Sequence, residues 1–148
     1  MQTISTPTQS IDLPARLRLA IARMARRMRQ EAGDELSPSM TAALATIENH
    51  GPLTPSALAE LERIKRPTAT RVLHRLEEDG LIERTADPSD GRSTVVHITK
   101  PGAALLKKLR SRKNAYLARR LRELPAEDVD VLERAAGVLE RLLDGERR

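Results

Sequence analysis

Apolar positions recur at steps of three and four residues between residues 11 and 33, which is the period of an amphipathic helix. These positions are Leu13, Leu17, Ile21, Met24 and Met28. Gly33 ends the pattern, because glycine readily adopts the backbone conformation that closes a helix. The sequence therefore predicts a first helix with an apolar stripe that needs a partner surface.

Three shorter helices are predicted next, and each has a proline in its first turn. Ser37-Pro38 and Thr54-Pro55 combine an N-cap side chain with a proline at the first helical position. The first of these helices runs to about Asn49 and the second through Leu61. Arg66-Pro67 begins a longer helix, and Gly80 lies where a left-handed C-terminal cap would end it, followed by Leu81 as the hydrophobic partner of that cap.

After Gly80 the pattern changes to short β-prone runs, at residues 81–85 and 94–99. The segment between them, Asp87-Pro88-Ser89-Asp90-Gly91-Arg92, is rich in turn residues, so we expect a hairpin with a polar, extended tip.

Thr99 is a suitable N-cap for a long helix to about Glu123. Pro125 starts a last helix that continues to about Asp144, with Glu127 and Asp128 placed favourably for its dipole.

This order predicts a mainly α fold with a small β-hairpin wing, in which a winged helix-turn-helix core is flanked by dimerisation helices. We expect a flexible tail at 1–10, an N-terminal dimerisation helix at 11–33, a DNA-binding domain at 34–100 and C-terminal dimerisation helices at 101–148. The terminal helices have long apolar stripes and little of their own chain to pack against, which favours intertwining with a second copy.

Charge is polarised along the second helix of the helix-turn-helix. Residues 62–92 hold seven basic and seven acidic side chains, so net charge does not explain DNA binding. The basic residues lie at the start of the helix, however, and Glu77, Glu78 and Asp79 lie at its end. The candidate DNA contacts are Lys65, Arg66, Thr68, Thr70, Arg71, His74 and Arg75 on this helix, and Asp90, Arg92 and Ser93 at the hairpin tip.

Arg66 is an unusual residue for a helix N-cap, where Ser, Thr, Asn or Asp would be usual. Two alternatives follow. Either Thr68 caps the helix from inside, or Arg66 contacts a DNA phosphate.

Composition narrows the function classes. The chain has 148 residues, a net charge of +5, no cysteine and one aromatic residue, Tyr116. The absence of cysteine excludes disulfides, thiol sensing and cysteine-ligated zinc, and the scarcity of aromatic residues argues against single-stranded nucleic acid. With no membrane-length apolar run and no signal peptide, we expect a cytoplasmic protein without membrane contact.

Enzymatic motifs are also missing from the sequence. It contains no glycine-rich phosphate loop, no G-x-S-x-G and no carboxylate pair in an apolar setting. His50, His74 and His97 lack metal-ligand spacing. We therefore expect neither catalysis nor a cofactor or bound metal.

The segment LTPSALAELERIKRPTATRVLHRLEEDGLIERTADPSDGRSTVVHITK, residues 53–100, resembles the core of the MarR family of transcriptional regulators. Within it, TATRVLHRLEEDGLIER is similar to the family's reading helix and following strand, and DPSDGRSTVVHIT is similar to its wing. The resemblance implies a reading helix in the major groove and Arg92 in the minor groove. It also implies that Asp90 orients Arg92 or braces the wing against Arg84.

The same resemblance implies a homodimeric repressor on double-stranded DNA. Its operator would be pseudo-palindromic, with half-sites about one helical turn, roughly 34–36 Å, apart. A small phenolic or anionic effector would release it, bound in a pocket between the dimer helices and the reading unit. Met24, Met28 and Met40 would then either line that pocket or belong to the core.

Two alternatives remain open at the level of the sequence. The winged helix could be a protein- or RNA-interaction module without operator specificity. In the first helix, a set of arginines either solvates the outer face and pairs with acids across the dimer, or contacts phosphate or an anionic ligand. These are Arg16, Arg23, Arg26, Arg27 and Arg29.

Overall fold

The computed structural model describes residues 12–147, so the tail expected at residues 1–10 lies outside the described part of the chain. Its elements are α1 (Leu13–Ala32), α2 (Pro38–His50), α3 (Pro55–Glu62), α4 (Arg66–Glu78), β1 (Ile82–Ala86), β2 (Thr94–Ile98), α5 (Lys100–Arg122), α6 (Ala126–Asp144) and a short 3-10 turn, η1 (Gly145–Arg147). The mainly α fold with one antiparallel hairpin is confirmed.

Side-chain caps set the helix starts where the sequence predicts them. Ser37 Oγ accepts a hydrogen bond from the Met40 amide at 3.2 Å, and Thr54 Oγ1 accepts one from the Ala57 amide at 3.1 Å. Each bond satisfies an amide that the first helical turn leaves without a backbone partner. Because a proline follows each cap, the starts of α2 and α3 are fixed locally.

The end of α4 is closed by a Schellman motif at Gly80. Gly80 has a φ of 72°. The Leu81 amide donates to the Leu76 carbonyl at 2.9 Å, and the Gly80 amide donates to the Glu77 carbonyl at 3.0 Å. Leu81 is buried, as the hydrophobic partner in this motif usually is. The predicted C-terminal cap is therefore confirmed.

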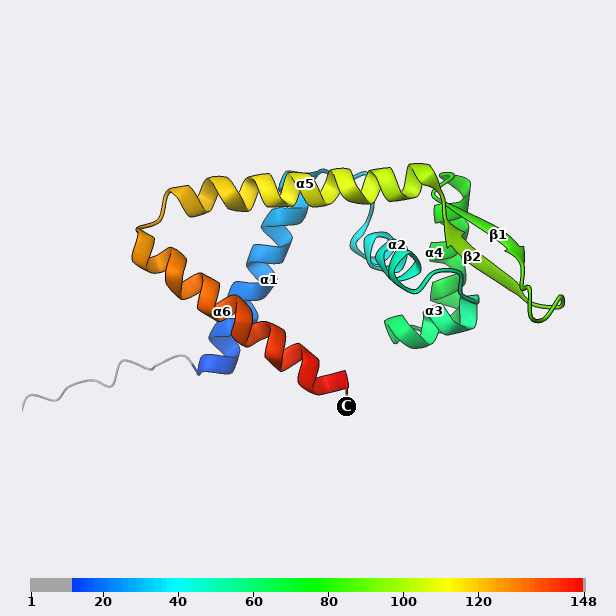
Figure 1. The fold of residues 1–148 in the computed structure, drawn as a ribbon, viewed down its shortest axis with the longest axis horizontal. Helices are drawn as coiled ribbons and strands as arrows, with labels where there is room; N and C mark the ends of the chain where they lie inside the picture. Colours follow the sequence, from blue (N-terminus) through cyan, green and yellow to red (C-terminus); the bar gives the residue numbers. More distant parts are fainter. Residues whose placement is uncertain (1–11, 148) are drawn as a thin grey trace, which may run out of the picture.

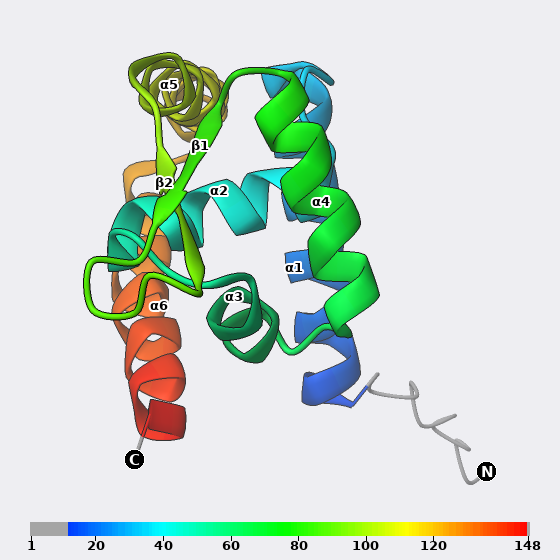
Figure 2. The ribbon, with the colours of Figure 1, turned by 90° about the vertical axis from the view of Figure 1, so that its right-hand side faces the viewer.

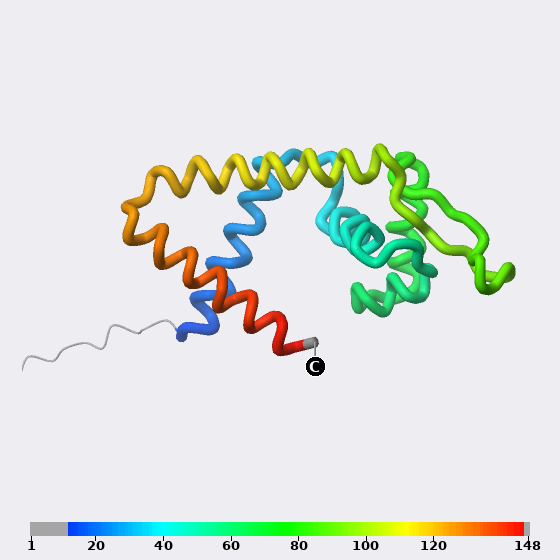
Figure 3. Tube along the Cα trace, in the orientation of Figure 1, coloured from blue at the N-terminus to red at the C-terminus, as the bar shows by residue number. Residues whose placement is uncertain are grey.

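The molecule has two parts joined by α5. Figure 1 shows α2, α3, α4 and the hairpin gathered at one end of α5, which we call the head. Helix α1 packs along the other half of α5, and α6 turns back from its far end. Figure 2 looks at the head and shows that α1 and α6 lie on different sides of the molecule. The bare chain trace in Figure 3 shows how far α5 extends beyond the head.

One apolar core holds the head together and includes the near half of α5. Its largest fully buried side chains are Leu44, Ile47, Leu58, Leu73, Leu76, Ile82, Val96 and Leu106. The hairpin pairs Ile82 with Ile98 at its root and Ala86 with Thr94 near its tip. Leu53 also exchanges backbone hydrogen bonds with Val96, at 3.1 and 2.8 Å, which ties the wing to the segment before α3.

Thr99 and Gly102 join the end of α4 to the start of α5. Thr99 Oγ1 donates to the Gly80 carbonyl at 2.7 Å and accepts from the Gly102 amide at 3.2 Å, which confirms it as the N-cap. The Thr99 amide donates to the Leu81 carbonyl at 3.0 Å. Gly102 is packed against Leu81 so closely that a Cβ there would overlap the Leu81 carbonyl oxygen.

Helices α1 and α6 leave large apolar side chains exposed. Leu13 is 64% exposed on α1, and Leu142 and Leu143 are 63% and 64% exposed on α6. No residue of α6 is buried within the protomer. The other exposed large apolar residues of these two helices are Leu17, Leu19, Ile21, Met24, Val131, Leu132, Val138 and Leu139. Such a large apolar area is typical of a surface that another molecule covers.

Candidate nucleic-acid interface

Helix α4 buries one face in the head and exposes the other. Its buried residues are Ala69, Leu73 and Leu76, at steps of four and three. Arg71 and His74 lie on the exposed face, one turn apart. The helix therefore presents polar side chains along the surface of the head, as a reading helix must.

Internal ion pairs on α4 are confined to its C-terminal half. Arg75 Nε lies 3.7 Å from Asp79 Oδ2, and His74 Nε2 lies within hydrogen-bond distance of Glu78 Oε1, at 3.1 Å. Over residues 12–147, no ion pair is formed by Lys65, Arg66 or Arg71 at the other half. The two ends of α4 therefore differ in ion pairing as well as in charge. The cations near its start are available to an external anion.

The start of α4 corrects one sequence prediction. The N-cap residue is Lys65, and no side chain caps the helix, so Thr68 does not cap it from inside. Pro67 follows in the first turn without an amide hydrogen of its own. The uncapped amides and the helix dipole make this end a favourable position for a phosphate.

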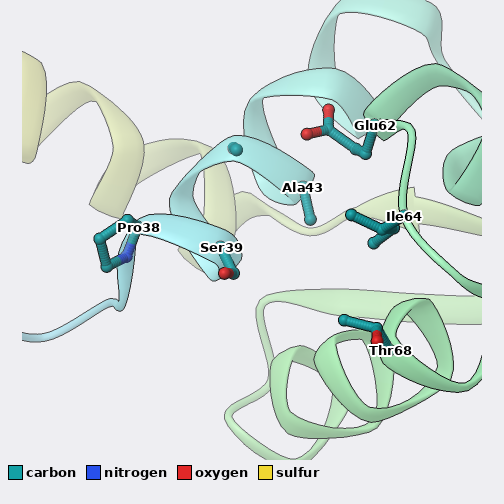
Figure 4. Close-up of a pocket in the computed structure, with 7 residues that line it drawn as sticks. Pro38, Ser39, Ala43, Glu62, Ile64 and Thr68 are labelled. Atoms are coloured by element: carbon teal, nitrogen blue, oxygen red, sulfur yellow. The ribbon is translucent and has the colours of Figure 1, made fainter.

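Thr68 and Thr70 differ in what they offer. Thr70 is exposed, but its hydroxyl donates to the Arg66 carbonyl at 3.0 Å, which leaves its oxygen as an acceptor. Thr68 is half-buried and lines a pocket of about 280 Å³ between α2 and the turn before α4. Figure 4 shows Thr68 and Ile64 facing Ser39 and Ala43 across this pocket.

Two aspartates fold the wing tip. Asp87 Oδ1 accepts from the amide and the hydroxyl of Ser89, at 3.0 and 2.8 Å, and these bonds hold the pKa of its carboxyl below the usual value. Asp90 Oδ1 accepts from the Arg92 amide at 3.1 Å, and Asp90 Oδ2 accepts weakly from the Ser93 hydroxyl at 3.5 Å. Asp90 therefore orients the backbone that carries Arg92.

The alternative role for Asp90, a brace against Arg84, is wrong. Arg84 Nε instead donates to Glu77 Oε2 at 2.6 Å, which connects the wing strand to the end of α4. Arg92 is exposed, and no ion pair of Arg92 is found in residues 12–147. The tip thus presents an arginine on a fixed turn.

Net charge does not favour DNA at the head. Residues 33–99 contain seven basic and eleven acidic side chains, whereas α5 contains nine basic residues and no acidic one. Any attraction of the head for DNA must therefore come from where its cations are placed.

A second pocket lies where the head meets α1 and α5. It has a volume of about 270 Å³, and its cations are Arg29 from α1 and Lys113 from α5. Met28 lines it, whereas Met40 packs against the core and Met24 is exposed. The remaining lining residues are Ala25, Pro38, Thr41, Ala42 and Ala45. An apolar pocket flanked by two cations suits a small organic anion.

Residues 12–147 contain no cluster of three or more His, Cys, Asp or Glu side chains arranged to hold a metal ion. In the same part of the chain, no helix has the length and apolar character needed to cross a membrane.

Sequence reasoning missed two residues of α5 that contact distant parts of the chain, Gly102 and Arg112. Gly102 had a usable signal, because a glycine inside the first turn of a helix often marks close approach of another backbone. Arg112 of α5 had none, because its partners Ala32 and Glu35 lie about 80 residues away in the sequence.

Comparisons with known proteins agree with this architecture. A family model described as the MarR family matches residues 36–94. An uncharacterised HTH-type transcriptional regulator of Mycobacterium leprae is 37% identical over 133 residues, which cover 89% of this chain and 93% of that protein. The HTH-type transcriptional repressor NicR of Pseudomonas putida is 28% identical over 133 residues, covering 88% and 81%.

Solved structures show the same fold. A putative transcriptional regulator from Pseudomonas aeruginosa gives a TM-score of 0.83 at 32% identity, covering 93% of this chain and 98% of that one. A mutant MarR from E. coli gives a TM-score of 0.76 at 24% identity, covering 90% and 97%. The chain has a helix-turn-helix and a wing, and a transcriptional regulator matches it at 37% identity over 89% of its length. It therefore belongs to the MarR family of DNA-binding transcriptional regulators.

Proposed function

We propose that this protein is a homodimeric repressor that binds a pseudo-palindromic duplex operator and is released by a small anionic ligand. The observation that carries the operator-binding part is the pairing pattern on α4. Lys65, Arg66 and Arg71 form no internal ion pair in the described chain, although eleven acidic side chains lie in the same head. Arginine and lysine placed this way neutralise phosphates and read guanine edges.

The dimer is supported by the exposed apolar faces of α1 and α6. The residues of α6 that remain uncovered, Val131, Leu132 and Leu139 among them, form one stripe along the helix. A second copy could cover this stripe with its own terminal helices, because a two-fold interface uses the same patch on both subunits. In this proposal α1, α6 and the far half of α5 form the dimerisation unit, residues 34–100 form the DNA-binding domain, and the protein acts in the cytoplasm.

The first test is a binding measurement with fluorescently labelled duplexes. A sequence selected from random DNA by the purified protein should bind at least about 1,000-fold more tightly than unselected duplex at physiological salt. Arg71→Ala should weaken binding to the selected sequence by roughly 1–3 kcal/mol and relax the preference at one base position. Equal binding of selected and random duplex would favour the alternative, a protein- or RNA-interaction module without operator specificity. Binding to an RNA duplex of the selected sequence would be measured alongside as the control for that alternative.

Arg92→Ala tests the wing. The minor groove is narrow in A·T-rich DNA, where its negative potential is enhanced, so an inserted arginine gains most there. We expect about a tenfold loss of affinity for an operator with A·T-rich flanks and a smaller loss when the flanks are G·C-rich. Arg63→Ala, at the turn between α3 and α4, is the matched control for the loss of one positive charge. If both flanks lose affinity equally, the wing does not read groove shape.

The effector part of the proposal depends on the pocket between α1, α2 and α5. Arg29 and Lys113 bring two cations to a lining that is otherwise mostly apolar, which fits an aromatic carboxylate or phenolate. A ligand there changes DNA affinity only if it binds the two orientations of the head unequally. Adding benzoates and phenols to the operator titration would identify such a ligand, and Lys113→Gln should weaken its effect without changing operator affinity.

A further inference from the structure

Arg112 lies near the middle of α5 and reaches the linker between α1 and α2. Its Nη1 donates to the Ala32 carbonyl at 2.8 Å and to Glu35 Oε1 at 2.7 Å. Ala32 is the last residue of α1 and is almost fully buried. Glu35 lies in the linker that leads into α2. A single guanidinium therefore joins α5, the end of α1 and the start of the head, and we call this contact the linker clamp.

The electrostatics of the linker clamp are favourable at both acceptors. The Ala32 carbonyl belongs to the last turn of α1, where a cation satisfies an unpaired acceptor and the helix dipole. The hydrogen bond from Arg112 holds the pKa of the Glu35 carboxyl below its usual value, with smaller help from Lys108. The Glu35 side chain is therefore a carboxylate at neutral pH.

Exposure shows what the clamp contributes. The side chains of Arg112 and Glu35 are 37% and 40% exposed. Ion pairs with this much solvent access add little to stability. The ion pair between Arg112 and Glu35 is therefore a weak source of stability, and the contact is better suited to holding three segments in one arrangement.

Gly33 adapts the linker to this contact. Its φ is 99°, in the region that favours glycine. A Cβ at this position would lie 2.5 Å from Glu35 Oε2 and 3.2 Å from Arg112 Nη1. The linker thus has the one residue that lets the carboxylate and the guanidinium approach the backbone this closely.

The clamp lies where the two parts of the protomer are held to each other. Helix α1 packs along α5, and the head also packs on α5 through α2. Arg110 pairs with Glu48 of α2 at 2.8 Å, on the head side of the clamp. Arg119 approaches Glu31 of α1 at 3.8 Å, on the other side. Only Arg112 contacts the linker itself among the ion pairs of residues 12–147.

We propose that Arg112 is a positioning residue that fixes the orientation of the head relative to α1 and α5, and so the spacing of the two reading helices in the dimer. This inference rests on the proposed dimeric binding of an operator. Both heads must meet their half-sites together, so a looser joint lowers the fraction of dimers with the required spacing. The apparent dissociation constant rises by the inverse of that fraction.

The variants Arg112→Gln and Arg112→Lys test the proposal in a graded way. The glutamine removes the charge and most of the reach, whereas lysine retains a cation that can donate to both oxygens. We expect about tenfold weaker operator binding for Arg112→Gln, within the usual range of coupling between sites, and an intermediate loss for Arg112→Lys. The matched control is Lys107→Gln, which removes one positive charge from the head side of α5 at an exposed residue that forms no ion pair within residues 12–147.

A distance measurement separates the joint from the DNA. Because the chain has no cysteine, spin labels can be attached at Arg26→Cys on α1 and Glu60→Cys on α3. The labelled protein is diluted with unlabelled protein, so that only the distance within one protomer is measured. Arg112→Gln should broaden the distance distribution, and Lys107→Gln should leave it unchanged. The distance measurement tests the linker clamp even if the wild-type protein is a monomer or lacks operator preference. Either of those two results would contradict the proposed function and not the role of Arg112.

The proposal is overturned if Arg112→Gln keeps the wild-type distance distribution and operator affinity. It is also overturned if Lys107→Gln weakens operator binding to the same extent, because loss of charge alone would then explain the effect. If Arg112→Gln fails to fold by circular dichroism, Arg112→Lys carries the same comparison. A narrow, unshifted distribution in that variant with wild-type affinity would again reject a positioning role.

Discussion

Leu132→Glu is expected to convert the dimer to a monomer and to weaken operator binding by about 100-fold or more, because two linked heads bind with avidity that a single head lacks. Leu132 lies on the apolar stripe of α6 and is 46% exposed in the protomer. A carboxylate there would have to be desolvated in a dimer interface without a partner, at a cost of several kcal/mol.

The protomer itself should tolerate this change. Helix α6 has no buried residue within the protomer, so a charge on its apolar face should leave the head folded. Analytical ultracentrifugation and circular dichroism would measure the two effects separately. Arg141→Glu introduces the same side chain on the polar side of α6 and should stay dimeric. A dimeric Leu132→Glu protein with full operator affinity would show that α6 is not part of the interface.

Gly102→Ala is expected to lower the free energy of unfolding by about 3 kcal/mol, at the upper end of what overpacking usually costs. The new Cβ would overlap the Leu81 carbonyl oxygen and lie 2.9 Å from Ile98 Cγ1. Backbone cannot move aside as a flexible side chain can. The Thr99 amide donates to the same Leu81 carbonyl, so the strain falls on the junction between the wing and α5.

A second glycine provides the control with the opposite sign. Gly137 lies within α6, and a Cβ there would meet only Arg141 Nη1, at an ordinary 3.6 Å. Gly137→Ala should therefore stabilise the helix by roughly 0.5–1 kcal/mol through its backbone entropy. Urea unfolding of both variants would test the pair. If Gly102→Ala were as stable as wild type, the close packing of α5 on Leu81 would not be a constraint.

Local signals were sufficient for the elements of this fold. Ser37, Thr54 and Thr99 cap helices where the sequence predicts caps, because a cap depends only on residues within one turn. Gly80 ends α4 for the same reason. The lysine at the N-cap of α4 was not foreseen, since lysine is not a preferred N-cap residue and no side chain caps this helix.

Contacts between distant residues were beyond such reasoning. Arg84 was considered as a partner of Asp90 but pairs with Glu77, and choosing between two carboxylates requires the register of the hairpin against α4. The linker clamp joins residues 77 and 80 positions apart. The apolar stripe of α6, in contrast, was readable from spacing alone, because it depends on the helical period and no residue of α6 is buried in the described part of the chain.

The length of α5 has a mechanical consequence. From Arg112 to the wing root at Thr99 there are 13 residues, which span about 20 Å at 1.5 Å per residue. Pivoting this rod by about 10° near Arg112 would displace the wing root by about 3.4 Å, one base step along a DNA strand. The helix acts as a lever, so a small rotation near Arg112 is enough to move the head out of register with its half-site.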